Sequence, residues 1–180
     1  MPLLITISGS AGTGKTTHSK LISEKYNLKH VSAGLIFRQF AKENKLTLEE
    51  LSKKTLIDNS IDLQIDKRIV EIAKKGNIVV EGRLTAWMLK DMNAFKIYLR
   101  APIDIEIERI AARDRKTLDE AKIETLAREK SEKRRFKKIY NIDITDLSIY
   151  DIVLNTHLYS IESVSEILFK ALDEYIKTKN

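Results

Sequence analysis

The sequence has no cysteine, only two prolines and six glycines, and a single tryptophan in 180 residues. The absence of cysteine excludes disulfides and thiolate metal sites and fits a reducing compartment. The prolines stand at positions 2 and 102, and no Ser/Gly-rich linker or internal repeat interrupts the chain. We therefore expect one domain over residues 1–180.

The sequence also lacks a basic leader and a long apolar run. The short apolar stretch near the N-terminus contains Thr6 and ends at Ser8. This pattern predicts a buried strand, neither a signal peptide nor a membrane span. We expect a cytoplasmic protein with no membrane partner.

Charge is plentiful, and it is mostly positive. The formal net charge is +6, which favours polyanionic partners such as nucleotides or nucleic acid. For most of the lysines the simpler interpretation is a solvated surface.

The most informative motif is Gly9-Ser-Ala-Gly-Thr-Gly-Lys-Thr16, which fits G-x-x-x-x-G-K-[ST]. It directly follows the apolar run Leu3–Ile7, and a segment of helical period, Thr16–Tyr26, comes next. In that context backbone N–H groups wrap a phosphate, Lys15 reaches the outer phosphates, and the Thr16 hydroxyl holds Mg²⁺. The predicted ATP-binding residues are Gly9, Ser10, Ala11, Gly12, Thr13, Gly14, Lys15, Thr16 and Thr17.

Helical and strand patterns alternate along the whole chain, which predicts a parallel sheet covered by helices. Thr47-Leu-Glu-Glu50 and Thr117-Leu-Asp-Glu120 are capping-box patterns, and the second opens a helix expected to reach about Tyr140. A final amphipathic helix is expected over Ile161–Ile176. The candidate strands are Leu3–Ser8, Lys29–Val31, Asn77–Glu81, Phe95–Leu99 and Asp151–Leu154.

Arginines distinguish among the classes of phosphate-loop proteins. No D-x-x-G motif follows a later strand and no N-K-x-D motif is present, which argues against a GTPase switch. Arg38 follows the second predicted strand and Arg83 follows the third. Ligands of an open α/β sheet bind at the carboxyl ends of its strands, and the guanidinium fork suits phosphate oxygens.

Two further groups of arginines share helix faces. Arg109 and Arg113 are four residues apart, and Arg128, Glu132 and Arg135 occupy positions i, i+4 and i+7. On spacing alone, a solvated helix with internal ion pairs is the favoured interpretation of the second group.

Taken together, these segments resemble the archaeal-type cytidylate kinases of the nucleoside monophosphate kinase family. The resemblance covers nearly the whole chain. It is carried by Gly9–Thr16, His30–Gly34 with Phe37-Arg38, Glu81–Arg83, Glu108–Arg113, Glu129–Arg135 and Ser148–Thr156.

The resemblance implies a three-layer α/β P-loop kinase fold with a five-stranded parallel sheet. It implies a helical monophosphate-binding region at about 34–75 and a lid at about 109–128. The implied reaction transfers the γ-phosphoryl group of ATP to CMP or dCMP and uses Mg²⁺. We expect the protein to act as a monomer and to bind no nucleic acid.

The resemblance also assigns roles to single residues. Its catalytic residues are Lys15, Arg83, Arg109, Arg113 and Arg128. The acceptor nucleotide would be bound by Arg38, Arg83, Arg128, Glu132 and Arg135, with Glu132 near the ribose and Arg135 reaching the cytosine. Thr16 and Glu81 would serve the metal, Glu81 by ordering a water bound to it.

Two departures bear on base selectivity. Bacterial relatives carry an Asp directly after the arginine of Asp-Gly-Arg, where this chain has Leu84, and Glu81 replaces the first Asp. The long bacterial insert in the monophosphate region is also missing. Other groups must therefore read the base, and Asp58, Asp62 and Asp66 are the candidates, with at least one of them expected to be merely solvated.

Two alternatives stay open at this level. The same chemistry could serve AMP, UMP or a small alcohol such as shikimate. A nucleotide- or RNA-binding P-loop protein without catalysis would also account for the basic charge and the arginine-rich helix.

Overall fold

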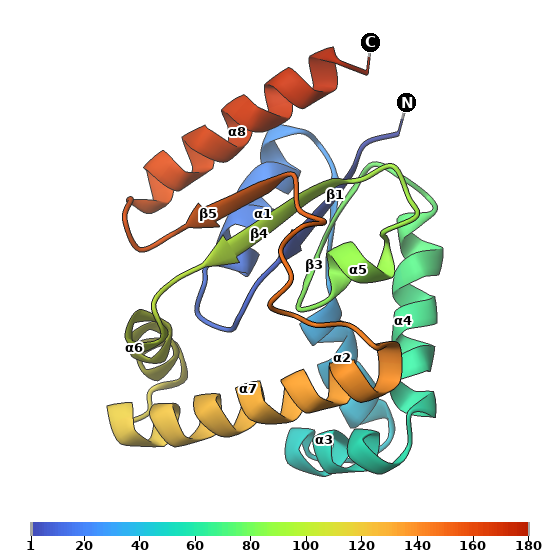
Figure 1. Ribbon diagram of the computed structural model, residues 1–180, viewed down its shortest axis with the longest axis vertical. Coiled ribbons are helices and arrows are strands. Elements are labelled where there is room, and N and C mark those ends of the chain that lie inside the picture. The colour runs from blue at the N-terminus through green and yellow to red at the C-terminus, as the bar shows by residue number, and fades with distance from the viewer. Residues whose placement is uncertain (1, 180) are drawn as a thin grey trace.

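The computed structural model describes residues 2–179. Its centre is a five-stranded sheet of order β2-β3-β1-β4-β5, in which every neighbouring pair is parallel (Figure 1). The strands are β1 (Leu4–Ser8), β2 (Lys29–Ser32), β3 (Ile78–Gly82), β4 (Phe95–Arg100) and β5 (Ile152–Asn155).

Helices cover both faces of the sheet and extend beyond its carboxyl edge (Figure 1). They are α1 (Lys15–Lys25), α2 (Ala33–Glu43), α3 (Leu48–Ile57), α4 (Ser60–Ala73), α5 (Thr85–Met88), α6 (Ile103–Asp114), α7 (Leu118–Tyr140) and α8 (Ile161–Lys177). In the described part of the chain no helix is long and apolar enough to cross a membrane.

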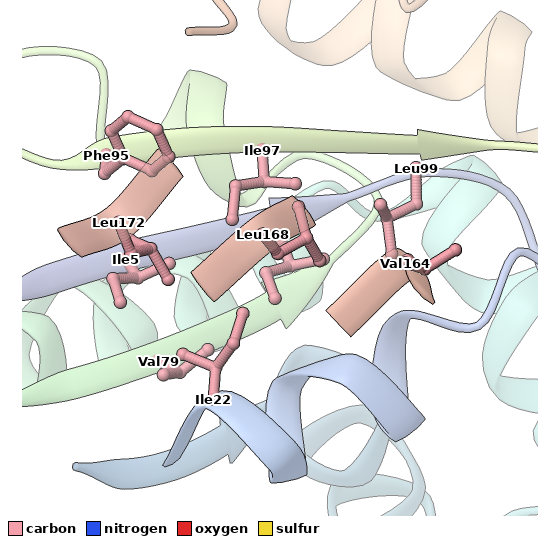
Figure 2. Packing of buried hydrophobic residues seen from close by; sticks show 10 residues of the cluster. Ile5, Ile22, Val79, Phe95, Ile97, Leu99, Val164, Leu168 and Leu172 are labelled. Carbon is pink, nitrogen blue, oxygen red and sulfur yellow. The ribbon is translucent and has the colours of Figure 1, made fainter. Parts of the chain in front are cut away.

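Two apolar clusters bind these layers to the sheet. On one face Ile22 of α1 and Val164, Leu168 and Leu172 of α8 pack against the strands (Figure 2). On the other face the cluster includes side chains of α2 and α4 together with Ile78 and Val80 of β3. The strands β1 and β3 are buried along their full length, as expected of central parallel strands.

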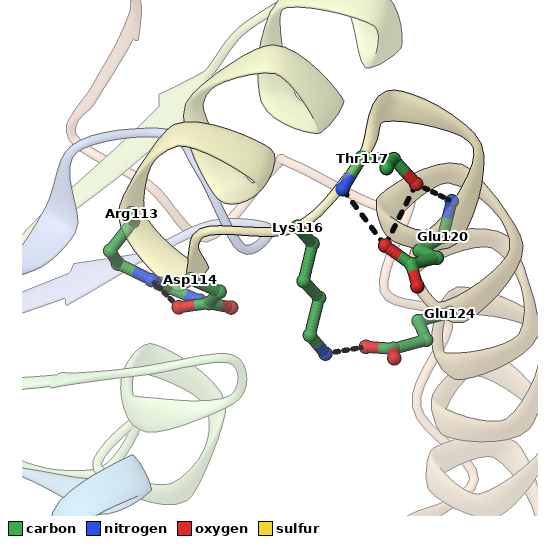
Figure 3. A network of polar contacts seen from close by, with 6 residues as sticks. All are labelled: Arg113, Asp114, Lys116, Thr117, Glu120 and Glu124. Atoms are coloured by element: carbon green, nitrogen blue, oxygen red, sulfur yellow. Dashed lines mark hydrogen bonds and ion pairs between the residues drawn. The ribbon is translucent and has the colours of Figure 1, made fainter.

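Both capping boxes are present. Thr47 and Thr117 each accept a hydrogen bond from the backbone N–H of the glutamate three residues later, and that glutamate bonds back to the threonine. Figure 3 shows the second box, which begins α7 directly after the turn from α6. The two helices α6 and α7 form the helical hairpin over residues 103–140.

The predicted elements are confirmed with small corrections. Asn77 was expected to begin a strand but has a φ of 49°, so it belongs to the turn before β3. The short helix α5 was not expected. The excursion after β2 is divided into three helices, α2, α3 and α4.

The register brings the carboxyl ends of the strands together. Ser8 at the end of β1 lies opposite Gly82 and Tyr98, and Ser32 lies opposite Glu81. The phosphate loop, Arg83 and the start of α2 therefore share one edge of the sheet.

Candidate active site

The loop after β1 follows a path that requires glycine. Gly9 and Gly12 have φ values of 146° and 79°. A Cβ atom on Gly9 would lie 2.1 Å from the Leu99 carbonyl oxygen, and one on Gly12 would lie 2.6 Å from the Glu106 carbonyl oxygen. The loop thus packs directly on the backbone of β4 and α6.

The Lys15 side chain folds back onto its own loop. Its ammonium donates a hydrogen bond to the Ser10 carbonyl oxygen at 2.5 Å. Burial, and next the positive charge of Arg83, lowers the pKa of Lys15 to about 8. The lysine is therefore held over an anion-binding loop at the start of α1, while Thr16 and Thr17 are exposed.

Thr16 and Glu81 meet across the edge of the sheet. The Thr16 hydroxyl donates to both Glu81 carboxylate oxygens, at 2.8 and 3.0 Å, and His30 Nε2 lies 3.6 Å from Glu81 Oε1. Burial alone would raise the pKa of Glu81, but contacts from His30, Thr16 and Ser32 hold it below its ordinary value. The charged carboxylate and the hydroxyl are oxygen donors of the kind that Mg²⁺ accepts.

Among the described residues, no group of three or more His, Asp or Glu side chains could hold a metal ion by itself. The donor set at Thr16 and Glu81 therefore suits an ion that keeps waters and takes further ligands from phosphate oxygens.

Arg83 lies at the centre of an ion-pair network. Its Nη2 lies 2.5 Å from Glu129 Oε1, and its Nε lies 2.7 Å from Glu132 Oε2. Arg128 Nε donates to Glu132 Oε1 at 2.8 Å. Burial alone would raise the pKa of Glu132, but Arg83 and Arg128 hold it below its ordinary value. The structure thus brings Arg83, Arg128 and Glu132 together, a set of contacts that the spacing along α7 did not predict.

Arg135 occupies the next position along the same face of α7. Its Nη1 donates to Thr55 Oγ1 of α3 at 2.8 Å, and its Nε lies 3.5 Å from Asp62 Oδ2 of α4. Arg135 and Asp62 are both buried. Burial raises the pKa of Asp62, although Arg135 opposes this change.

The other two acidic candidates have separate surroundings. Asp66 accepts a hydrogen bond from the Tyr140 hydroxyl, and burial raises the pKa of Asp66 to about 6. Asp58 is exposed and accepts from the Ser60 backbone N–H. Asp58 is thus the solvated member of the three.

Arg38 is the least constrained of the predicted acceptor-binding residues. It is exposed, and it makes no hydrogen bond or ion pair with the rest of the described chain. Its guanidinium nitrogens lie 3.7 and 3.9 Å from the position that a Cβ atom on Gly34 would occupy, which is ordinary van der Waals contact. Arg38 also borders a groove lined by Ala41, Lys42, Lys45, Leu46 and Thr47.

The two arginines of α6 point to different partners. Arg109 donates to the Gly12 carbonyl oxygen at 3.1 Å and to Thr156 Oγ1 and O at 2.9 and 3.0 Å. Arg113 pairs with the neighbouring Asp114, and its side chain is 62% exposed. Arg109 therefore ties the phosphate loop to the end of β5, and the predicted action of both arginines on the transferring phosphoryl group stays a prediction.

Sequence reasoning missed two groups of this site. Glu106 of α6 is buried, and burial, followed by the charge of Glu129, raises its pKa to about 7. Tyr98 of β4 has a raised pKa, mainly through burial. The spacing of Glu106 three residues before Arg109 was a signal that could have found it.

Comparisons with known proteins agree with this geometry. The model of the cytidylate kinase-like family matches residues 4–158. A cytidylate kinase of Methanocaldococcus jannaschii is 49% identical over 97% of this chain and 100% of the relative. One of Pyrococcus horikoshii is 48% identical over 95% of this chain and 88% of the relative.

Solved structures support the fold alone, because their sequence identities are low. An uncharacterized protein of Eubacterium ventriosum superimposes with a TM-score of 0.71 at 19% identity, over 95% of this chain and 98% of that one. A shikimate kinase of Bacteroides thetaiotaomicron gives a TM-score of 0.65 at 18% identity, over 96% and 99%. The chain thus has the expected P-loop kinase fold.

Proposed function

The chain belongs to the cytidylate kinase-like family, and we propose that it transfers the γ-phosphoryl group of ATP to CMP or dCMP, giving ADP and the diphosphate. One observation supports this proposal most strongly. Thr16 of the phosphate loop donates to Glu81, and Arg83, two residues after Glu81, pairs with Glu129 and Glu132 of α7. The predicted donor loop and the predicted acceptor arginines therefore lie along one edge of the sheet.

The donor side would be formed by the loop from Gly9 to Thr17. Its backbone N–H groups and the N-terminus of α1 would bind the β-phosphate of ATP, and Lys15 would leave Ser10 to reach the transferred group. Thr16 would bind Mg²⁺ and Glu81 would order the water around it. The ion would neutralise charge on the phosphate oxygens.

The acceptor side would be formed by Arg38, Arg83 and Arg128. Phosphoryl transfer depends on alignment and charge stabilisation, and the acceptor phosphate is already an anion at neutral pH. These arginines would hold it in line with the γ-phosphorus, so no strong general base is needed. Glu129 and Glu132 pair with Arg83, so an acceptor phosphate would compete with a carboxylate for that guanidinium.

The hairpin of α6 and α7 would act as the lid, in which Arg109 and Arg113 stabilise the transferring group. Figure 3 shows Arg113 paired with Asp114 at the end of α6, next to the turn that leads to α7. Closure would exclude water and limit hydrolysis of ATP.

An assay of ADP release across five acceptors tests the proposal. CMP, dCMP, UMP, AMP and shikimate are each offered with ATP and Mg²⁺. We expect CMP and dCMP to give the highest kcat/KM. A clear preference for AMP or shikimate would contradict the proposed substrate, and ATP-dependent RNA retention without ADP release would indicate a binding protein.

We also propose that the chain acts as a monomer in the cytoplasm, on small nucleotides and without nucleic acid or membrane partners. The cysteine-free sequence supports a reducing compartment. Light scattering during size-exclusion chromatography measures the oligomeric state, and a dimer at micromolar concentration would contradict the first part.

A further inference from the structure

The first residue after β5 contacts the phosphate loop through its side chain. Thr156 is buried, and its hydroxyl oxygen lies 3.1 Å from the Thr13 carbonyl oxygen and 2.9 Å from Arg109 Nη1. The contact joins three segments that are distant in the sequence, namely the loop after β1, helix α6 and the end of β5. A side chain from outside the loop therefore takes part in shaping it.

The direction of the Thr156 hydroxyl proton follows from its neighbours. A guanidinium has donors and no acceptor, so Arg109 must donate and Thr156 Oγ1 must accept. The single hydroxyl proton is then left for a carbonyl oxygen. The Arg100 carbonyl oxygen is 3.4 Å away and already accepts from the Thr156 backbone N–H at 2.9 Å, whereas the Thr13 carbonyl oxygen is 3.1 Å away. The hydroxyl therefore donates to Thr13.

Arg109 holds the neighbouring peptide of the loop at the same time. Its Nη1 atom donates to Thr156 Oγ1 at 2.9 Å and to the Gly12 carbonyl oxygen at 3.1 Å. Its Nη2 atom donates to the Thr156 carbonyl oxygen at 3.0 Å. Because Nη1 has two hydrogens, both of its bonds can form together. One pair of side chains thus holds two successive carbonyl groups, those of Gly12 and Thr13.

Holding these carbonyl groups also sets the direction of two N–H groups. A trans peptide is planar, and its C=O and N–H bonds point in opposite directions. The described chain contains no cis peptide bond. Because the carbonyl oxygens of Gly12 and Thr13 are held on one side of the loop, the N–H groups that follow them, on Thr13 and Gly14, point to the other side. A hydrogen bond to the carbonyl also polarises the peptide and strengthens its N–H as a donor.

We propose that Thr156 is a positioning residue for ATP, whose hydroxyl orients the Thr13–Gly14 peptide so that its N–H group donates to the phosphates of the nucleotide. The inference rests on the proposed function and adds to it a residue that acts through the backbone of the loop. A phosphate loop binds its anion with backbone N–H groups. The direction of these groups therefore decides both the affinity for ATP and the alignment of the transferred group.

Two other roles of the Thr156 hydroxyl give different results when it is removed. A hydroxyl that only satisfies the buried guanidinium stabilises the fold, so its loss lowers the melting temperature and leaves ligand binding unchanged. A hydroxyl that contacts the base of ATP changes the affinity for ATP but not for a phosphate chain without a base. A positioning hydroxyl changes the affinity for both ligands by the same factor.

The test compares Thr156→Ala with Thr156→Ser, because both lack the methyl group and only the second keeps the hydroxyl. We would measure the Kd for ATP by calorimetry, the inhibition constant of inorganic tripolyphosphate as a competitor of ATP, kcat, the KM for CMP and the melting temperature. Thr6→Val is the control. Thr6 is buried in β1, the strand before the loop, and its hydroxyl makes no hydrogen bond within the described chain, so its loss should leave both binding constants unchanged.

The effect of Thr156→Ala should be confined to the donor side. We expect the Kd for ATP and the inhibition constant of tripolyphosphate to rise together by about 10-fold, because a loop carbonyl and a buried guanidinium each lose a partner. The kcat should fall by about fivefold through misalignment of the transferred group. The KM for CMP should change by less than about twofold, and Thr156→Ser should stay within about threefold of the wild type in every constant.

Equal binding constants in Thr156→Ala and Thr156→Ser would overturn the inference and leave the hydroxyl a purely structural role. A rise in the Kd for ATP without a matching rise for tripolyphosphate would also overturn it. If Thr156→Ala folds poorly, Thr156→Cys takes its place with the same outcomes, because a thiol is a weak donor of similar size. A wild-type chain that binds ATP and tripolyphosphate but does not phosphorylate CMP would refute the proposed function and not this inference.

Discussion

The two halves of the candidate active site are held in different ways. On the donor side, backbone packs on backbone, because Gly9 and Gly12 approach the carbonyl oxygens of Leu99 and Glu106 with no room for a side chain. Arg109 and Thr156 add hydrogen bonds to the carbonyl oxygens of Gly12 and Thr13. This half is preorganised for its ligand.

On the acceptor side, charged side chains from separate elements hold one another. Arg83 follows β3, its partners Glu129 and Glu132 belong to α7, and Asp62 belongs to α4. Several of these atoms lack a well-aligned hydrogen bond. We therefore expect the loop to keep its shape when ATP binds, and the proposed acceptor site to exchange ion pairs for contacts to the nucleotide.

The largest effect is expected from the one donor-side group that moves. Lys15→Ala removes the charge that would stabilise the transferred phosphoryl group, and we expect kcat to fall about 1000-fold. Steady-state kinetics measure this, with the exposed Lys20→Ala on the same helix as control. A fall in ATP affinity with an unchanged kcat would show that Lys15 only binds the ground state.

Arg83→Ala should disturb the acceptor side alone. It removes a phosphate ligand and leaves Glu132 with one partner fewer, so kcat/KM for CMP should fall about 100-fold through both parameters. The KM for ATP should change by less than about twofold. Arg68→Ala, at an exposed position of α4, is the control. If CMP phosphorylation is unaltered in both parameters, Arg83 does not bind the acceptor.

Gly12→Ala tests the backbone contact of the donor side. At a φ of 79° and 2.6 Å from the Glu106 carbonyl oxygen, a Cβ would force the loop to shift. We expect the KM for ATP to rise about 30-fold. Gly34→Ala on the acceptor side meets its neighbours at 3.7 Å and should leave the KM for ATP unchanged. Equal effects of the two substitutions would contradict the difference between the halves.

The pKa of Lys15 predicts how ATP binding depends on pH. In the free protein this pKa is about 8, and bound phosphate would raise it because anions favour the ammonium. Below pH 8 the lysine is already charged, whereas above it ATP binding requires uptake of a proton. ATP affinity should therefore weaken by up to about tenfold per pH unit above pH 8. Calorimetry in buffers of different ionisation enthalpy measures the uptake, which Lys15→Ala should abolish.

The smallest effect is expected from Glu129→Gln. This substitution weakens a carboxylate contact to Arg83 that the acceptor phosphate must replace, so the KM for CMP should fall about threefold. Glu124→Gln, which affects only the Lys116 pair of the lid, should leave it unchanged. A raised KM would mean that Glu129 positions Arg83 for the phosphate.

Local chemistry explains why much of the molecule could be predicted. The loop Gly9–Thr16 contains the glycines that its backbone conformation requires. Each capping box lies within four consecutive residues, so the sequence alone specifies both features. Strand positions also followed from local apolar pattern. Asn77 and α5 were misjudged because a turn and a single helical turn give only a weak periodic signal.

Side-chain partnerships across elements could not be predicted in the same way. By spacing alone, a solvated helix was the favoured interpretation of the face shared by Arg128, Glu132 and Arg135. Only the tertiary structure shows that Glu132 and Arg135 are buried and pair with Arg83 and Asp62. Spacing put Arg109 and Arg113 on one face, yet they have unrelated partners. Glu106 was not recognised because its raised pKa results from burial and from the charge of Glu129, and both depend on tertiary structure.

The sequence by itself therefore determined the donor site, because the conformation of a phosphate loop depends on residues adjacent in the chain. Tertiary structure alone decided which partners the proposed acceptor residues have. Arg83, Asp62 and Arg135 are far apart in the sequence. Removal from water disfavours their charges, and only the packing of β3, α4 and α7 brings them the opposite charges that offset this cost, as in the Arg83–Glu132 and Arg135–Asp62 pairs.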